Sequence, residues 1–178
     1  MRARFNPKDG QLYVVGLRGW QTTAVKNGCL QRVRYTGEKV RTPLDLKVAQ
    51  GRVEVRFGEA LDPAVAKDPG SWNIEIWNYL WSAAYGSPEL STKVKPVAAA
   101  EVGKDGKPEF SKEQMSQTKH DLLKVTRVEL SADGRTAILH LADLAPCMQM
   151  SLKYNVRSAD GTELSGRITN TIHALPAK

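Results

Sequence analysis

A chain of 178 residues has room for one substantial domain, or for one domain and part of another. Its hydrophobic share of 41% and charged share of 25% are typical of globular proteins, and no run approaches the roughly 18 apolar residues of a membrane-spanning helix. The net charge is +7, but acidic residues are mixed among scattered basic ones. We therefore expect a solvated basic surface, no nucleic-acid partner and no membrane span.

The first part of the chain predicts strands separated by glycine turns. Leu12–Val15 and Leu30–Tyr35 are short runs bounded by turn residues, and Trp20 follows a Gly-Leu-Arg-Gly turn. Residues 1–42 are therefore expected to form strands of their own. The basic residues at the very start are not followed by an apolar run, so no export signal is expected in this chain.

Clearer alternation begins after residue 43. The predicted strands are 53–57, 72–76 and its continuation, 123–130, 136–141, 148–156 and 168–172, with one helical turn at 64–68. Within 148–156, the methionines, Leu152, Tyr154 and Val156 fall on one face. Residues 91–120 contain prolines and glycines without a clear period, which predicts a long loop. The expected fold is all-β: a short hairpin or blade-like remnant followed by an Ig-like β-sandwich over residues 43–178.

The sequence offers no pattern for a catalytic, cofactor-binding or metal site. His120, His140 and His173 match no ligand spacing and are expected to be surface or strand residues. The two cysteines, Cys29 and Cys147, lie in no C-x-x-C motif, and two separate buried thiols are the favoured reading, with a disulfide left open.

Three aspartates allow an alternative at one end of the sandwich. Asp62, Asp68 and Asp121 could form a calcium site, but an aspartate beside a turn usually caps backbone N–H groups. Capping is the favoured reading.

An aromatic run is the most distinctive feature of the chain. Trp72 shares the parity of Ile74 and Ile76 and is predicted to lie in the core. The aromatic residues of opposite parity are Trp77, Tyr79, Trp81 and Tyr85. Together with Trp20, they are the candidates for a ligand or interdomain contact: either they cover a second apolar surface at a junction, which we favour, or they form a row on which sugar rings stack.

Several segments resemble known bacterial modules. The runs Val53–Phe57, Leu61-Asp62-Pro63 and Trp72–Ile74 are similar to the "V-x-V-x-F…L-D-P…Y-x-V" opening of bacterial Ig-like modules. The later runs Asp133–Thr136, Leu144-Ala145-Pro146, Met148–Val156 and Asp160-Gly161 are similar to the closing half of such modules.

Three longer segments resemble a more specific family. "GQLYVVGLRGWQ" with "GCLQRVRYTG", "WNYLWSAAYGSPELS" and "PCMQMSLKYNVRSADGTELSGRITNTIHAL" are similar to the C-terminal region of large secreted haem-containing or quinoprotein-like dehydrogenases of planctomycetes and related bacteria. In those proteins a sugar-dehydrogenase-like β-propeller precedes the sandwich, and a cytochrome c domain lies elsewhere in the chain. The resemblance spans nearly the whole sequence.

The resemblance implies a non-enzymatic role. Residues 1–42 would be the last strands of a propeller, and residues 43–178 an accessory sandwich that contacts the propeller and cytochrome domains of a periplasmic or extracellular parent. Haem or a quinone would belong to the parent, because this chain has no C-x-x-C-H and no complete propeller. No catalytic or haem-binding role passes to any residue here. The alternative function is a carbohydrate-binding module that uses the aromatic row.

Overall fold

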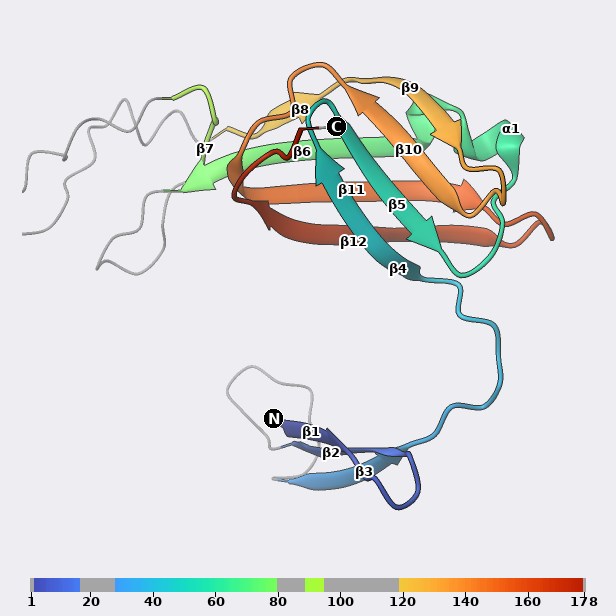
Figure 1. Ribbon diagram of the computed structural model, residues 1–178. Coiled ribbons are helices and arrows are strands. Elements are labelled where there is room, and N and C mark those ends of the chain that lie inside the picture. The colour runs from blue at the N-terminus through green and yellow to red at the C-terminus, as the bar shows by residue number, and fades with distance from the viewer. Residues whose placement is uncertain (1, 17–27, 80–88, 95–118, 178) are drawn as a thin grey trace, which may run out of the picture. The chain divides into compact units, whose positions relative to one another are not determined.

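The computed structural model describes residues 2–16, 28–79, 89–94 and 119–177, and the chain divides into two compact units (Figure 1). Unit 1 comprises Met1–Lys39 and unit 2 comprises Val40–Lys178. The division lies three residues before the boundary expected from the sequence.

Unit 1 is a three-stranded antiparallel sheet in the order β1-β2-β3. Its strands are β1 (Arg2–Phe5), β2 (Leu12–Gly16) and β3 (Cys29–Val33). Every residue of β1 and β3 is exposed, and β2 is mostly half-buried. Unit 1 therefore has no buried core among its described residues.

Unit 2 is a β-sandwich of two antiparallel sheets that pack face to face (Figure 1). The first sheet has the order β4-β5-β10-β9, with β4 (Pro43–Ala49), β5 (Arg52–Phe57), β10 (Thr136–Leu141) and β9 (Val125–Leu130). The second has the order β12-β11-β6-β7, with β12 (Glu163–Ile172), β11 (Cys147–Arg157), β6 (Trp72–Tyr79) and β7 (Glu89–Leu90). A further short strand, β8 (Asp121–Leu123), also pairs with β6. The predicted all-β sandwich is thus confirmed.

The core consists of the inward-facing residues of both sheets. Ile74 and Leu152 lie opposite each other on neighbouring strands, and both are fully buried. Trp72 is 4% exposed, as expected for a core residue, and its indole N–H donates to the carbonyl of Ala66 at 2.9 Å. Its ring meets Phe57 and Tyr154 in edge or tilted contacts, with centroids 6.4 and 6.3 Å away. Such a cluster of aromatic rings contributes both buried area and specific geometry.

A short helical connection joins β5 to β6. The helix α1 (Pro63–Ala66) and the 3-10 turn η1 (Pro69–Ser71) each begin with Asp-Pro. The carboxylates of Asp62 and Asp68 accept the backbone N–H groups of Ala64 and Gly70, both at 2.9 Å. The predicted capping role of these two aspartates is confirmed, and it satisfies backbone donors that a helix start leaves unpaired.

The structure differs from the sequence prediction in the following strands. The single strand predicted over 123–130 is two strands, because the chain leaves β8 in one sheet and enters β9 in the other at Lys124. In β11 a bulge between Cys147 and Met150 puts Cys147 in the core, while Met148 is 41% exposed instead of facing inward. The strands β1, β4 and β7 were not predicted. Most of the loop expected over 91–120 lies outside the described residues.

Candidate functional site

The predicted aromatic candidates are only partly within the described residues. Trp20, Trp81 and Tyr85 lie outside them. Trp77 and Tyr79 are half-buried on β6, at the parity opposite to the buried Trp72, so they are on the outer face of the sandwich. The outer face around these two residues is therefore the first candidate site.

Trp77 stacks on an imidazole that two carboxylates hold. The rings of Trp77 and His120 have centroids 3.9 Å apart and an interplanar angle of 8°. His120 Nδ1 lies 3.1 Å from Glu75 Oε2 on β6, and Nε2 lies 2.6 Å from Glu89 Oε2 on β7. With both ring nitrogens occupied and one ring face covered, His120 is fixed in position.

The charge state of His120 follows from these contacts. Partial burial lowers its pKa, but the hydrogen bonds and charges of Glu89 and Glu75 outweigh that effect and raise the pKa above its ordinary value. The charged form can donate from both nitrogens, whereas a neutral imidazole has only one N–H. The pair of carboxylates therefore favours imidazolium.

Asp121, the next residue, makes a second cluster with the segment after β7. Its carboxylate accepts the Ser91 hydroxyl and both the backbone N–H and hydroxyl of Thr92, all at 2.7 Å. Burial raises the pKa of Asp121, but these hydrogen bonds and the charge of Lys93 lower it overall. Asp121 thus binds the turn that follows β7. It lies on β8, whereas Asp62 and Asp68, the other two aspartates of the calcium hypothesis, cap the helical segments between β5 and β6.

A surface groove of about 470 Å³ lies at the same end of β6. It is lined by Asn78, Tyr79, Pro146, Cys147, Met148, Thr171, Ile172 and His173. The backbone N–H of Tyr79 donates to the Met148 sulfur at 3.4 Å, and the Asn78 side chain accepts the Met148 N–H at 2.9 Å. The groove therefore has a mixed polar and apolar lining.

The remaining sequence candidates are distributed over different elements. His140 lies on β10, with Nε2 3.3 Å from Glu129. Both cysteines are free thiols: Cys147 is buried, as predicted, with its pKa raised by that burial, but Cys29 is exposed, contrary to the prediction. Within the described ranges, no three His, Cys, Asp or Glu side chains come together as a metal site.

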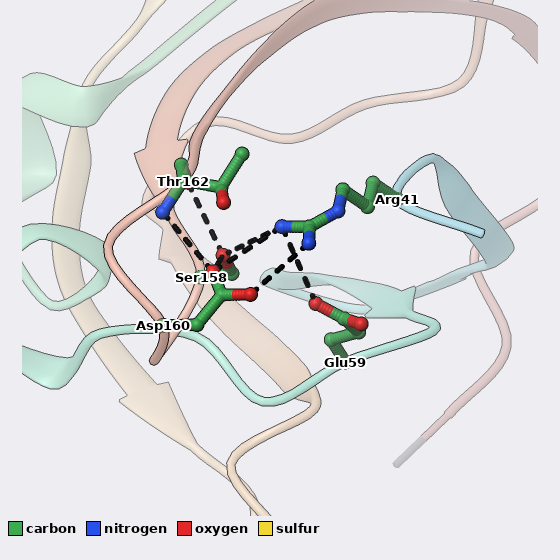
Figure 2. Close-up of polar contacts among 5 residues, drawn as sticks. All are labelled: Arg41, Glu59, Ser158, Asp160 and Thr162. Atoms are coloured by element: carbon green, nitrogen blue, oxygen red, sulfur yellow. Dashed lines mark hydrogen bonds and ion pairs between the residues drawn. The ribbon is translucent and has the colours of Figure 1, made fainter. Parts of the chain in front are cut away.

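Arg41 anchors the point where the chain enters the sandwich (Figure 2). Its guanidinium donates to the two carboxylate oxygens of Asp160 at 3.2 and 3.0 Å, and lies 3.6 Å from Glu59. It also donates to the Ser158 hydroxyl at 3.4 Å. Asp160 further accepts the N–H of Thr162, and the hydrogen bond from Arg41 is the largest cause that holds its pKa well below the ordinary value. This bidentate pair fixes the first residues of unit 2.

The turn that carries Asp160 occurs twice. Ser131–Gly134 and Ser158–Gly161 have the same sequence, Ser-Ala-Asp-Gly, and in both the aspartate accepts the serine hydroxyl. Both glycines have positive φ, which side-chain-bearing residues rarely adopt. Backbone hydrogen bonds join both turns to the segment between β5 and α1: Leu61 donates to Gly134, and Ala159 donates to Ala60. The repeated turn therefore holds the segment between β5 and α1 in place at this end of the sandwich.

Unit 1 presents two chemically different faces. Residues opposite one another in an antiparallel pair share a face. The apolar face contains Ala3, Phe5, Leu12, Val14, Cys29 and Val33, with Gln31 among them, and the arginine face contains Arg2, Arg4, Tyr13, Val15, Leu30 and Arg32. Phe5 is 71% exposed and Val33 is 50% exposed.

The basic residues are scattered along the chain, as expected, but the net positive charge lies mostly in unit 1, because most of the acidic residues are in unit 2. Met1–Lys39 contains eight Lys and Arg residues against two Asp and Glu, which gives +6 of the total +7. Counting charge by compact unit, which needs the unit boundary, would have revealed this asymmetry.

Comparisons with known proteins leave the family open. No protein-family model matches the chain, and no curated protein matches its sequence. One similar solved structure is the surface layer protein SbsC, domains 1–6, at 16% identity and a TM-score of 0.41, covering 71% of this chain and 12% of that one. Another is CopC from Methylosinus trichosporium OB3b, at 17% identity and a TM-score of 0.35, covering 75% and 84%. At these scores neither supports an argument about function. No helix of the described residues is long and apolar enough to cross a bilayer.

Proposed function

We propose that this chain is a non-catalytic accessory module of an exported haem- or quinone-dependent dehydrogenase-like protein, in which unit 1 docks on a neighbouring domain. The observation that carries the proposal is the apolar face of unit 1. The family resemblance supplies the identity of the neighbour, a preceding β-propeller, and the periplasmic or extracellular location.

The exposed apolar face requires a covering surface. A three-stranded sheet is stable when a hydrophobic face is buried, and units below about 40 residues usually need a disulfide, a metal or a partner. In unit 1, Phe5 and Val33 are on the apolar face and remain exposed, while Cys29 is a free thiol. A neighbouring domain that buries this face would provide the missing core.

The charge of unit 1 restricts the chemistry of that neighbour. Arg4 and Arg32 lie on either side of Tyr13 across the sheet, on the arginine face. Complementary charge favours a partner whose apolar contact area is bordered by acidic residues. Because the two faces lie on opposite sides of the sheet, one protein contacts both only if unit 1 sits in a cleft with an apolar wall on one side and acidic residues on the other, whereas a polyanion such as nucleic acid would leave the apolar face uncovered.

Contacts within unit 2 hold its first residues in place. Arg41 is held by Asp160, Glu59 and Ser158 (Figure 2), and the Val40 carbonyl passes so close to Gly58 that a Cβ there would lie 2.3 Å from it.

An antibody raised against the chain tests the proposal on the native polypeptide. In fractionated cells of the source organism, we expect the antibody to detect an exported polypeptide much larger than 19.7 kDa that stains for haem or reduces a dye with a sugar as donor. A native polypeptide of 19.7 kDa, or one confined to the cytoplasm, would refute it.

Carbohydrate binding is the second candidate, favoured by the position of Trp77 on the outer face beside Glu75 and Glu89. An aromatic ring beside carboxylates offers stacking and hydrogen-bond acceptors, although His120 covers one face of this ring. Sugars that bind there would quench tryptophan fluorescence, and Trp77→Ala would abolish the quenching while Tyr35→Ala, in unit 1, would not. The absence of quenching across a broad panel of glycans would remove this candidate.

A further inference from the structure

The edge of β6 is covered by two short strands placed end to end. β8 pairs with Ile74, Glu75 and Ile76, and β7 pairs with Asn78 and Tyr79. Trp77 is thus the one residue of β6 that lies between the segment paired with β8 and the segment paired with β7. An uncovered strand edge presents unpaired backbone groups that invite pairing with another chain, so this join is a vulnerable position.

The side chains around Trp77 fasten the two strands together. His120, which immediately precedes β8, stacks on Trp77 and contacts Glu75 on β6 and Glu89 on β7. The backbone N–H of Lys119 donates to the Glu89 carbonyl at 3.2 Å, which adds a direct bond between the two segments. One imidazole therefore links all three strands.

We propose that this cluster is a pH-operated clasp: charged His120 fastens β7 and β8 to each other over the edge of β6, and loss of its proton releases them. A neutral imidazole can donate to only one of the two carboxylates, so one hydrogen bond is lost, and because the ring then carries no charge the two carboxylates also lose the positive charge that compensated them.

The charges facing His120 determine the direction of the effect. Glu75 faces it from β6 and Glu89 from β7, while the Asp121 carboxylate of β8 is turned to Ser91 and Thr92 and has Lys93 beside it. Since the folded pKa is raised, the stabilisation is fully present below the ordinary value of about 6.5 and is lost as the pH rises through the folded pKa. The clasp is therefore closed while His120 is protonated and opens as the pH rises through its folded pKa.

NMR titration of the whole chain tests the clasp. We expect the ring signals of His120 to titrate with a midpoint above 6.5, Glu89→Gln and Glu75→Gln each to lower that midpoint, and Glu129→Gln, which removes the partner of His140, to leave it unchanged. A wild-type midpoint at or below 6.5 would overturn the proposal, and this measurement does not depend on any variant folding.

Amide exchange of the same samples tests the fastening itself. After correction for the intrinsic pH dependence of exchange, the protection of the Lys119 amide should fall across the His120 titration, while that of the Gly161 amide, which donates to Ser158 in a distant turn, stays constant. His120→Gln should show the low protection at every pH. Unchanged protection of Lys119 through the titration would show that His120 does not fasten the strands.

Discussion

The replacement Gly166→Ala tests how tightly the aromatic core is packed. Gly166 lies directly opposite Tyr154 in the β11–β12 pair, and a Cβ at position 166 would lie 2.5 Å from the Tyr154 hydroxyl oxygen and 2.8 Å from its Cζ. The Tyr154 ring cannot move aside freely, because it is 8% exposed and packs against Phe57 with centroids 5.4 Å apart and against Trp72.

The size of the effect follows from two opposing terms. Overpacking a filled core destabilises a protein by about 1–3 kcal/mol, while replacing a strand glycine with alanine stabilises by roughly 0.5–1 kcal/mol. The centres of these two ranges differ by about 1 kcal/mol, so we expect Gly166→Ala to lower the free energy of unfolding by about 1 kcal/mol. The midpoint of urea unfolding, followed by the near-ultraviolet circular dichroism of the aromatic cluster, measures this change.

Two further variants isolate the cause. Ser165→Ala is the control in the same strand, because Ser165 is the exposed neighbour of Gly166 on β12, and we expect little change. Adding Tyr154→Phe to Gly166→Ala removes the hydroxyl contact but leaves the ring carbon contact, so a double-mutant cycle should show partial recovery. A Gly166→Ala protein as stable as the wild type would refute the packing argument.

Three other outcomes are expected. Ile74→Ala, at a fully buried position in the centre of β6, should destabilise the sandwich by about 2–5 kcal/mol in urea unfolding, and a loss below 1 kcal/mol would contradict its place in the core. Asp121→Asn should destabilise the protein near pH 7 and approach the stability of the wild type in acid. The pKa of Asp121 is lowered in the folded state, so its stabilisation is present above the unfolded pKa and is lost as the pH falls through the folded pKa. A difference in urea midpoint that does not change with pH would refute this. A thiol reagent should modify exposed Cys29 rapidly and buried Cys147 slowly, and equal rates by mass spectrometry would refute that ordering.

Sequence alternation predicted the sandwich because its central strands are buried on one face only. In β6 the pattern of Trp72, Ile74 and Ile76 directly encodes which side faces the core, and the structure confirms it. Alternation could not reveal the sheet change at Lys124, because Leu123 and Val125 are both buried, each in a different sheet. The bulge that exposes Met148 likewise shifts the register, and no glycine or proline lies between Cys147 and Met150 to mark it.

The candidate sites depend on contacts between distant segments, which periodicity does not encode. Nothing in the sequence joins Glu75, Glu89 and His120, since the three are brought together by the pairing of β7 and β8 with one strand. The Arg41–Asp160 pair spans most of unit 2 in the same way. The capping roles of Asp62 and Asp68 were predictable, because a cap acts on the residues immediately after it.

Hydrogen exchange of unit 1 tests the docking proposal most directly. We expect the amides of β2 to exchange rapidly in the isolated chain, while those of β6 and β11 stay protected, because Phe5 and Val33 on the apolar face of unit 1 are exposed and its described residues form no buried core. In the native polypeptide isolated from the source organism, β2 should become protected to a degree comparable with the sandwich. Equal protection of β2 in both samples would contradict the claim that unit 1 docks on another domain.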